Sequence, residues 1–249
     1  MNARKWIQRW LRRTGYDVRW SPQVYVRYPQ ARLEVSVEMA IAQRFLAVKD
    51  FYFVQVGAFD GVCVDPIGAT MKRLACRGLM IEPHPLAFAR LQQNAADRPG
   101  VELLQAAVGD CEGELPFYSL DPAAPGAPAK APLISSLDRA MLMRELPADV
   151  DWTPWIRETR VRCTTLNRVL TERGSPRVDL LQIDAEGYDA RILAALDFDR
   201  WAPAIVNFEH ALLPRAEAER CWQRLAGRGY RLHISPPDTL AVLPSAGVA

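Results

Sequence analysis

The stretch FYFVQVGAFDGV, residues 51–62, decides the fold that the rest of the sequence must fit. Its first half is an unbroken run of apolar and β-branched residues, which is typical of a strand buried in a sheet. The run stops at Gly57, and a second glycine follows at Gly61. Glycine permits a tight turn and a close approach of the backbone to another group. A helical pattern comes next, so this stretch predicts the strand–turn–helix entrance of an α/β domain.

The same alternation of strands and helices continues on both sides of this stretch. Helices are expected at residues 37–46, 65–78, 85–97, 188–197 and 215–229, and a strand followed by a helix is expected within 159–174. Further strands are expected at 79–82, 101–108, 178–187, 203–210, 230–235 and 239–244, and residues 109–120 are expected to form a turn followed by another short strand. This order predicts an α/β fold with a mostly parallel sheet and helices on both of its faces.

Two regions fall outside the alternation. Residues 1–34 form an N-terminal extension to a domain predicted at 35–249, and residues 121–132 form a loop rich in proline and alanine that is either a lid or a passive insertion. Residues 1–20 carry six arginines and lysines against one acid, and Trp6, Ile7, Trp10 and Leu11 form one apolar stripe. Such a helix contacts an anionic membrane surface, packs on the domain or pairs with another chain.

The composition argues against several classes of function. Outside residues 1–20 the chain is mildly acidic, so no nucleic-acid partner is expected. The five cysteines contain no C-x-x-C pair, and with three histidines there is no zinc-ligand spacing. No apolar run reaches the length of a membrane-spanning helix, and no secretory signal is recognisable. We therefore expect a cytoplasmic protein, in contact with the inner membrane surface if the basic extension binds there.

The opening turn and the next strand together predict a nucleoside-cofactor site. Gly57 and Gly61 give G-x-x-x-G, not the G-x-G-x-x-G of dinucleotide binders, because Phe59 occupies the middle position. Glu82 ends the second predicted strand, where an acid can accept hydrogen bonds from both ribose hydroxyls of an adenosine. Glu82 could instead be a solvated acid at a strand end.

A second group of acids follows two later strands. Asp184 and Glu186 close one apolar strand, and Glu209 and His210 close the next. Ligands bind at the carboxyl ends of the strands in an open parallel sheet, so these residues should lie near Gly57 and Glu82. The structural alternatives are that Glu186 caps the following helix and that Glu209 pairs with an arginine.

These segments carry a family resemblance that runs from about residue 50 to residue 243. The blocks FVQVGAFDG, MIEPHP, AAVGDCEG, ISSL, VRCTTLNRVL and VDLLQIDAEGYDARIL resemble, in order, those of the FkbM-type S-adenosylmethionine-dependent methyltransferases. The resemblance implies a Rossmann-like class I methyltransferase fold with a seven-stranded sheet. It also implies O-methylation of a sugar, glycan or natural-product hydroxyl, with S-adenosylmethionine as cofactor.

The resemblance also assigns residues to the cofactor. Residues 55–61, including Gly57, Asp60 and Gly61, would form the loop under its methionine part. Glu82 would hold the ribose, and Asp110 would border the adenine. Asp184 and Glu186 would lie near the transferred methyl group. The family commonly has an acid where this chain has Gln55, and an amide loses the charge-assisted part of a bond to the cofactor's ammonium group.

Transfer to a hydroxyl requires a base, and His210 is the first candidate because an unperturbed imidazole titrates near neutral pH. Asp184 is the alternative. The acids could instead hold a divalent cation that lowers the hydroxyl pKa, which we do not favour because few carboxylate clusters are metal sites. Two other functions stay open: a degenerate cofactor-binding scaffold without turnover, and an NAD-dependent oxidoreductase. The oligomeric state cannot be predicted.

Overall fold

The computed structural model describes residues 36–63, 65–121, 124–126, 134–146, 149–174 and 177–244. The predicted extension at residues 1–34, with its expected membrane contact, lies outside these residues, as does most of the 121–132 loop. Among the helices in the described ranges, none combines the length and the apolar character needed to cross a membrane.

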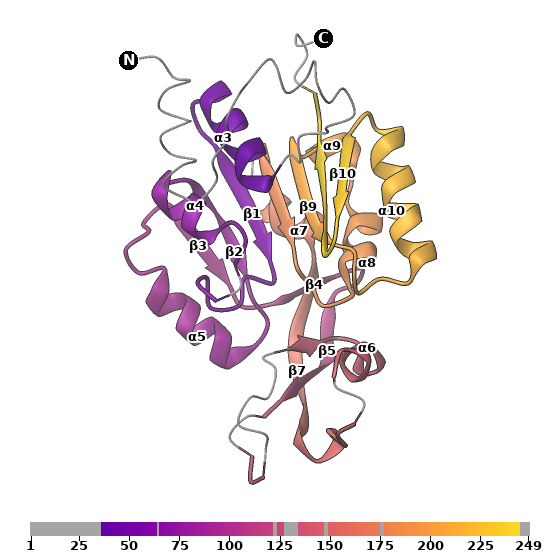
Figure 1. Ribbon diagram of the computed structural model, residues 1–249. Coiled ribbons are helices and arrows are strands. Elements are labelled where there is room, and N and C mark those ends of the chain that lie inside the picture. Colours follow the sequence, from indigo (N-terminus) through magenta and orange to yellow (C-terminus); the bar gives the residue numbers. More distant parts are fainter. Residues whose placement is uncertain are drawn as a thin grey trace, which may run out of the picture. The chain divides into compact units, whose positions relative to one another are not determined.

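The predicted seven-stranded, mostly parallel sheet is confirmed (Figure 1). Its order is β10-β11-β9-β8-β1-β2-β3. The parallel strands are β1 (Tyr52–Val56), β2 (Arg77–Ile81), β3 (Val101–Leu104), β8 (Leu180–Ile183) and β9 (Ile205–Glu209). At the edge, β11 (Asp238–Val242) runs antiparallel to both β9 and β10 (Arg231–Ser235). From β1 the chain adds strands outward through β2 to β3, whereas from β8 it adds strands outward in the opposite direction, beginning with β9. The boundary between β1 and β8 is therefore a topological switch point, which is where open α/β sheets bind ligands.

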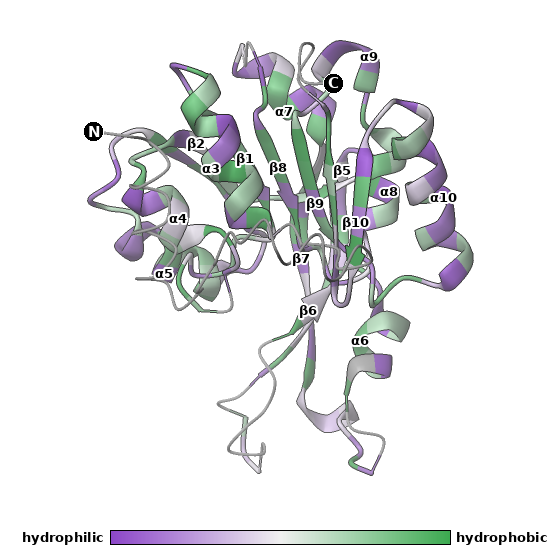
Figure 2. Ribbon diagram, turned by 45° about the horizontal axis from the view of Figure 1, so that its top comes forward, coloured by the Kyte–Doolittle hydropathy of each residue, from purple (hydrophilic) through white to green (hydrophobic). Residues whose placement is uncertain are grey.

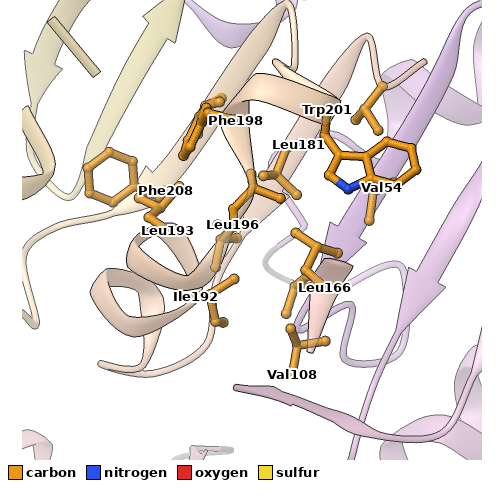
Figure 3. Packing of buried hydrophobic residues seen from close by; sticks show 14 of the residues in the cluster. Val54, Val108, Leu166, Leu181, Ile192, Leu193, Leu196, Phe198, Trp201 and Phe208 are labelled. Atoms are coloured by element: carbon orange, nitrogen blue, oxygen red, sulfur yellow. The ribbon is translucent and has the colours of Figure 1, made fainter. Parts of the chain in front are cut away.

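Helices cover both faces of this sheet, and the interior strands are buried on both sides. One face packs against α3 (Val37–Ala47), α4 (Gly68–Arg73) and α5 (Pro85–Asn94), with Phe53 and Leu180 among its strand residues. The other face packs against α7 (Leu166–Glu172), α8 (Asp189–Ala195), α9 (Phe198–Trp201) and α10 (Arg215–Gly227). In Figure 2 the strands β1, β8 and β9 are largely green, whereas α10 shows both purple and green. Figure 3 shows the second layer from inside, with Val54 and Leu181 near Leu166 and Trp201.

A second sheet, which the sequence did not predict, is inserted between β3 and β8. Its order is β4-β7-β5-β6, and the strands are β4 (Ala107–Gly109), β5 (Gly113–Leu120), β6 (Ser135–Ser136) and β7 (Ile156–Thr165). The short helices α6 (Arg139–Glu145) and η1 (Thr153–Trp155) lie in the same insertion. In Figure 1 it extends from the end of the large sheet where the strands finish.

The single strand predicted at 101–108 is therefore wrong, since this segment contributes β3 to one sheet and β4 to the other. Leu104 pairs with Ile81, and its carbonyl accepts the amide of Glu82 at 3.1 Å. The next amide on that side of the chain, that of His84, is donated to the Glu82 carboxylate at 2.7 Å and does not extend the ladder. The chain therefore leaves β2 after Leu104, and Ala107 pairs with Cys163 of β7.

The helix predicted at 65–78 is also shorter than expected. The Asp65 carboxylate accepts the amides of Ile67 and Gly68 at 3.0 and 2.8 Å, which places a turn before the helix begins at Gly68. Ala75 has a φ of 51°, a left-handed conformation that ends a helix. The chain from Arg77 onward is then free to enter β2.

Asp179, just before β8, joins three segments at the other end of the sheet. It is fully buried, and its carboxylate pairs with Arg44 at 2.8 Å and Arg177 at 3.0 Å and accepts the Tyr52 amide at 3.0 Å. We expect Asp179→Ala to lower the free energy of unfolding by about 3 kcal/mol, because it leaves these donors without an acceptor. Urea unfolding measures this loss.

Asp97→Ala is the matched control for Asp179→Ala. Asp97 also pairs with a base at 2.8 Å, but both it and its partner Lys72 are more than half exposed. Exposed pairs contribute little, so this variant should unfold close to the wild type. Equal losses in the two variants would contradict the structural role given to Asp179.

Candidate active site

A cavity of about 410 Å³ opens at the switch point between β1 and β8. Its lining comes from the carboxyl ends of β1, β2 and β8 on one side and from the second sheet on the other. The lining includes Gln55, Gly57, Phe59, Asp65, Glu82, Ala106, Val108, Phe117, Ser136, Gln182, Asp184, Glu186 and Tyr188. Five predicted site residues, at positions 55, 57, 82, 184 and 186, are thus brought together at one cavity, which is within the size range of small-molecule sites.

The glycines of the opening turn serve the packing of the turn itself. Gly57 has a φ of 74°, and a Cβ placed there would lie 1.7 Å from the carbonyl oxygen of Asp184. Gly61 has a φ of 71° and would meet the Leu91 side chain at 2.8 Å. Gly57 is therefore glycine because β1 and the loop after β8 touch there, and Gly61 is not among the residues that line the cavity.

Asp60 holds the same turn together. Its carboxylate accepts the amides of Val62 and Cys63 at 3.0 and 2.7 Å, and it is buried. It does not line the cavity. The structure therefore gives the predicted cofactor residue Asp60 a role in shaping the turn that carries Phe59.

Glu82 lies in the cavity wall as the sequence predicts. Each carboxylate oxygen accepts one backbone amide, Oε2 from Phe59 at 2.8 Å and Oε1 from His84 at 2.7 Å. A carboxylate oxygen can accept a second hydrogen bond, so both retain capacity for a ligand hydroxyl. Burial raises the pKa of Glu82 to about 7, against the two amides, and the charge of Asp184 adds to the rise. The pair of oxygens fits the two hydroxyls of a ribose.

Asp184 is a further acid of the cavity lining and is half-buried just after β8. Burial raises its pKa to about 6, and the carboxylates of Asp238 and Asp65 add to the rise. A carboxylate that titrates near 6 is ionised at neutral pH and still takes up a proton readily. Asp184 can therefore act as a general base at the cavity.

Glu186 follows in a strained loop that the second sheet supports. Its φ is 47° and that of Gly187 is 90°. The Ser136 hydroxyl donates to the Glu186 carbonyl at 2.9 Å, and a Cβ on Gly187 would meet Met141 at 2.5 Å. The insertion therefore fixes the loop that carries Asp184 and Glu186.

Glu209 and His210 do not line the cavity. His210 Nδ1 lies 3.0 Å from the hydroxyl of Thr239, which also accepts a hydrogen bond from Trp222 at 2.8 Å. Its ring packs edge-on against Trp222 with the centroids 5.5 Å apart, and burial lowers its pKa. His210 thus joins the end of β9 to β11 and α10, and the structure favours Asp184 over His210 as the base.

Asp189, which the sequence did not single out, connects the two loops that carry these acids. It is fully buried, and its oxygens accept the amides of Ala185 and Glu209, both at 3.2 Å. Burial, together with the charges of Asp184 and Glu209, raises its pKa well above the ordinary value. An acid three positions after Glu186, at the start of a mostly apolar helix, was the signal available in the sequence.

The segment expected to border the adenine is placed only in part as predicted. Residues Ala106 to Val108 line the cavity, whereas Asp110 is exposed and is not part of the lining. The apolar side chains, with Phe117 on β5, offer a flat surface for a base. Tyr188 and Phe117 were not predicted, because their contribution depends on the second sheet.

Gln55 provides the test of whether this cavity fits the expected cofactor. It is 2% exposed and lines the cavity, and its Oε1 has no hydrogen-bond partner among the described residues. A buried amide oxygen without a partner is costly, and an ammonium group is a suitable donor for it. With Glu82 nearby in the same lining, the residues fit S-adenosylmethionine. Across the described ranges, no group of three or more potential ligands could hold a metal ion.

Comparisons with known proteins agree with these features. The family model described as "Methyltransferase FkbM domain" matches residues 55–232. No curated protein matches the chain. A solved methyltransferase FkbM from Methylobacillus flagellatus KT is 12% identical with a TM-score of 0.48, and the match covers 89% of this chain and 50% of that one. A precorrin-6y C5,15-methyltransferase from Geobacter metallireducens GS-15 is 11% identical with a TM-score of 0.39, over 85% and 90% of the two chains. This chain spans half the length of the first of these structures.

Proposed function

The chain belongs to the FkbM methyltransferase family, and from that premise we propose that it methylates a hydroxyl group of a sugar, glycan or natural product. The family implies S-adenosylmethionine as the methyl donor. The observation that carries the proposal is Asp184, whose pKa is raised to about 6 at the edge of the cavity that contains Glu82 and Gln55. A hydroxyl acceptor needs a base at this position.

Besides this base, methyl transfer requires only that the protein binds the cofactor and aligns the acceptor with it. When bound, S-adenosylmethionine supplies a methyl group attached to a sulfonium. The rest of the cofactor is the leaving group, and because it departs as a neutral thioether it needs no help from an acid. Gln55 and Glu82 would hold the two ends of the cofactor. Asp184 would accept the hydroxyl proton of the acceptor and orient its oxygen for in-line attack. The loop fixed by Ser136 would keep Asp184 and Glu186 in place.

Two other functions make different predictions. A scaffold without turnover would bind S-adenosylmethionine tightly and methylate nothing, and Gln55 in place of an acid is the feature that keeps it open. An NAD-dependent oxidoreductase is disfavoured by Phe59, which occupies the position of the middle glycine in a dinucleotide fingerprint. Calorimetric titration with S-adenosylmethionine and NAD separates the oxidoreductase from the other two.

The direct test is transfer of a labelled methyl group from S-adenosylmethionine to a panel of acceptors. The panel would contain free sugars, lipid-linked glycans and polyhydroxylated natural products, together with amine and carboxylate compounds. We expect label on a hydroxyl, located by mass spectrometry and by its resistance to ester hydrolysis. Label found on amines or carboxylates alone would contradict the proposal, and no label with tight cofactor binding would favour the scaffold.

Cofactor affinity should depend on pH through Glu82. Below about pH 7 the ligand-free protein holds a proton on Glu82, whereas the ionised form is the better acceptor for ribose hydroxyls. The affinity for S-adenosylhomocysteine should therefore rise as the pH increases through about 7, with release of a proton on binding. Calorimetry in buffers of different ionisation enthalpy measures both effects. In Glu82→Gln the rise should disappear, and if it persists, another group is responsible.

A further inference from the structure

Two glutamine amides lie side by side in the cavity. Gln55 on β1 and Gln182 on β8 are register partners, and both line the cavity although they are only 2% and 1% exposed. Gln182 is in turn the register partner of Asn207 on β9, which is 2% exposed. Register partners on neighbouring strands point to the same face of a sheet, so three buried amides form one row across three strands.

At one end of the row, a carboxylate orients Gln55. The Gln55 side chain stabilises the charged form of the Asp65 carboxylate. Asp65 Oδ1 accepts the amides of Ile67 and Gly68, and its Oδ2 has no hydrogen-bond partner among the described residues. An amide favours a carboxylate charge through its N–H donors, so the NH₂ group of Gln55 is the end that faces Asp65. Its carbonyl Oε1 then points the other way, and this is the atom without a partner among the described residues.

At the other end, Asn207 orients Gln182 in the opposite sense. The Asn207 Nδ2 group donates to Gln182 Oε1 at 2.9 Å and to the Asp238 carboxylate at 3.4 Å. Since its oxygen is used in this way, Gln182 has only its NH₂ group to offer elsewhere. Nε2 makes one long hydrogen bond, to the Ile183 carbonyl at 3.4 Å, and it carries two protons. One N–H of Gln182 is therefore left for the cavity.

The cavity thus presents an amide acceptor from Gln55 beside an amide donor from Gln182, and the two are neutral. We propose that this pair recognises the amino acid end of the cofactor, with Gln55 Oε1 accepting from the α-ammonium group and Gln182 Nε2 donating to the α-carboxylate. Asp65 and the Asn207–Asp238 pair are positioning residues that fix which way each amide faces. The inference rests on S-adenosylmethionine as the cofactor. It explains why an amide at position 55 suits this chain: the acceptor is aimed by Asp65 and needs no charge.

Ligands that lack one group of the zwitterion test this assignment. Decarboxylated S-adenosylmethionine retains the amine without the carboxylate, and 5′-methylthioadenosine has neither. We expect Gln182→Met to weaken S-adenosylmethionine binding about tenfold or more and to leave decarboxylated S-adenosylmethionine nearly unchanged. Gln55→Met should weaken both ligands and leave 5′-methylthioadenosine unchanged. Isothermal titration calorimetry gives each dissociation constant without relying on turnover.

The positioning role predicts that Asn207→Leu reproduces the pattern of Gln182→Met, because Gln182 loses the donor that orients it. A merely structural role would instead weaken all three ligands alike. Gln92→Met on the exposed side of α5 is the matched control and should bind every ligand as the wild type does. Thermal unfolding shows whether each variant folds. If Gln182→Met does not fold, Gln182→Glu replaces it in the test, because it keeps the shape of the side chain and replaces the donor by an acceptor. It should show the same loss of carboxylate recognition.

The outcomes separate this inference from the proposed function. Equal losses for S-adenosylmethionine and decarboxylated S-adenosylmethionine in the Gln182 variants would overturn the inference and leave the methyltransferase assignment intact. A wild-type protein that binds 5′-methylthioadenosine as tightly as S-adenosylmethionine would also overturn it. A wild-type protein that binds none of the three would overturn the cofactor premise, and the inference with it.

Discussion

Replacement of Asp184 by asparagine is expected to lower kcat by about 10²- to 10⁴-fold, the usual contribution of a general base. Asparagine keeps the size of the side chain but cannot accept the hydroxyl proton. The wild-type kcat should increase with pH up to about 6, where Asp184 ionises, and level off above it. The residual activity of Asp184→Asn should lack this step. Single-turnover methyl transfer at several pH values measures both effects.

Asp110→Asn is the control, because Asp110 is an aspartate of the same domain that is exposed and does not line the cavity. It should match the wild type in rate and in pH profile. Calorimetry with S-adenosylhomocysteine should show that Asp184→Asn still binds the cofactor product. Unchanged kcat in Asp184→Asn would exclude Asp184 as the base. The base would then have to be another group, such as His210, which lies outside the cavity lining.

Substitution of Gly57 by alanine is expected to lower the free energy of unfolding by about 3 to 5 kcal/mol. A left-handed conformation costs a non-glycine residue about 1–2 kcal/mol. The larger part comes from the new methyl group, which would lie 1.7 Å from the Asp184 carbonyl oxygen. Both sides of this contact are backbone, so no side-chain rotation relieves it, and β1 and β8 must separate.

Gly174→Ala isolates the conformational part of this cost. Gly174 has a φ of 58°, and nothing lies within 4 Å of a Cβ built on it. Urea unfolding of the two variants should therefore show a clearly larger loss for Gly57→Ala, and the difference measures the contact with Asp184. If the two variants lose the same stability, the close approach of the strands is not what requires a glycine at position 57.

The sequence predicted the large sheet well, because most of its strands are local apolar runs next to a helix. The prediction that residues 55, 82 and 184 lie at one site followed from the rule that ligands bind at the carboxyl ends of parallel strands. The second sheet could not be predicted in this way. Its strand β4 is three residues long and pairs with β7 more than 50 residues later, so no local pattern reports it.

The same limit explains why the structure places some of the predicted site residues outside the cavity lining. Gly57 and Asp60 were correctly found in the turn, but one sequence cannot distinguish a glycine that makes room for a ligand from one that makes room for a neighbouring strand. His210 was favoured as the base from the intrinsic pKa of imidazole, whereas its neighbours Thr239 and Trp222 are remote in sequence. Gln182 did carry a signal, since a polar residue inside the apolar run DLLQID requires a partner.

The contact between β1 and β8 also governs when the active site can form during folding. These neighbours in the sheet are far apart in the chain: the Tyr52 amide and the Asp179 carboxylate that it binds are 127 residues apart. The whole second sheet is synthesised between them. Contacts at such separation form late because closing the intervening loop is entropically costly. The first three strands can pair as soon as they are made, but the cavity cannot exist until β8 has inserted beside β1.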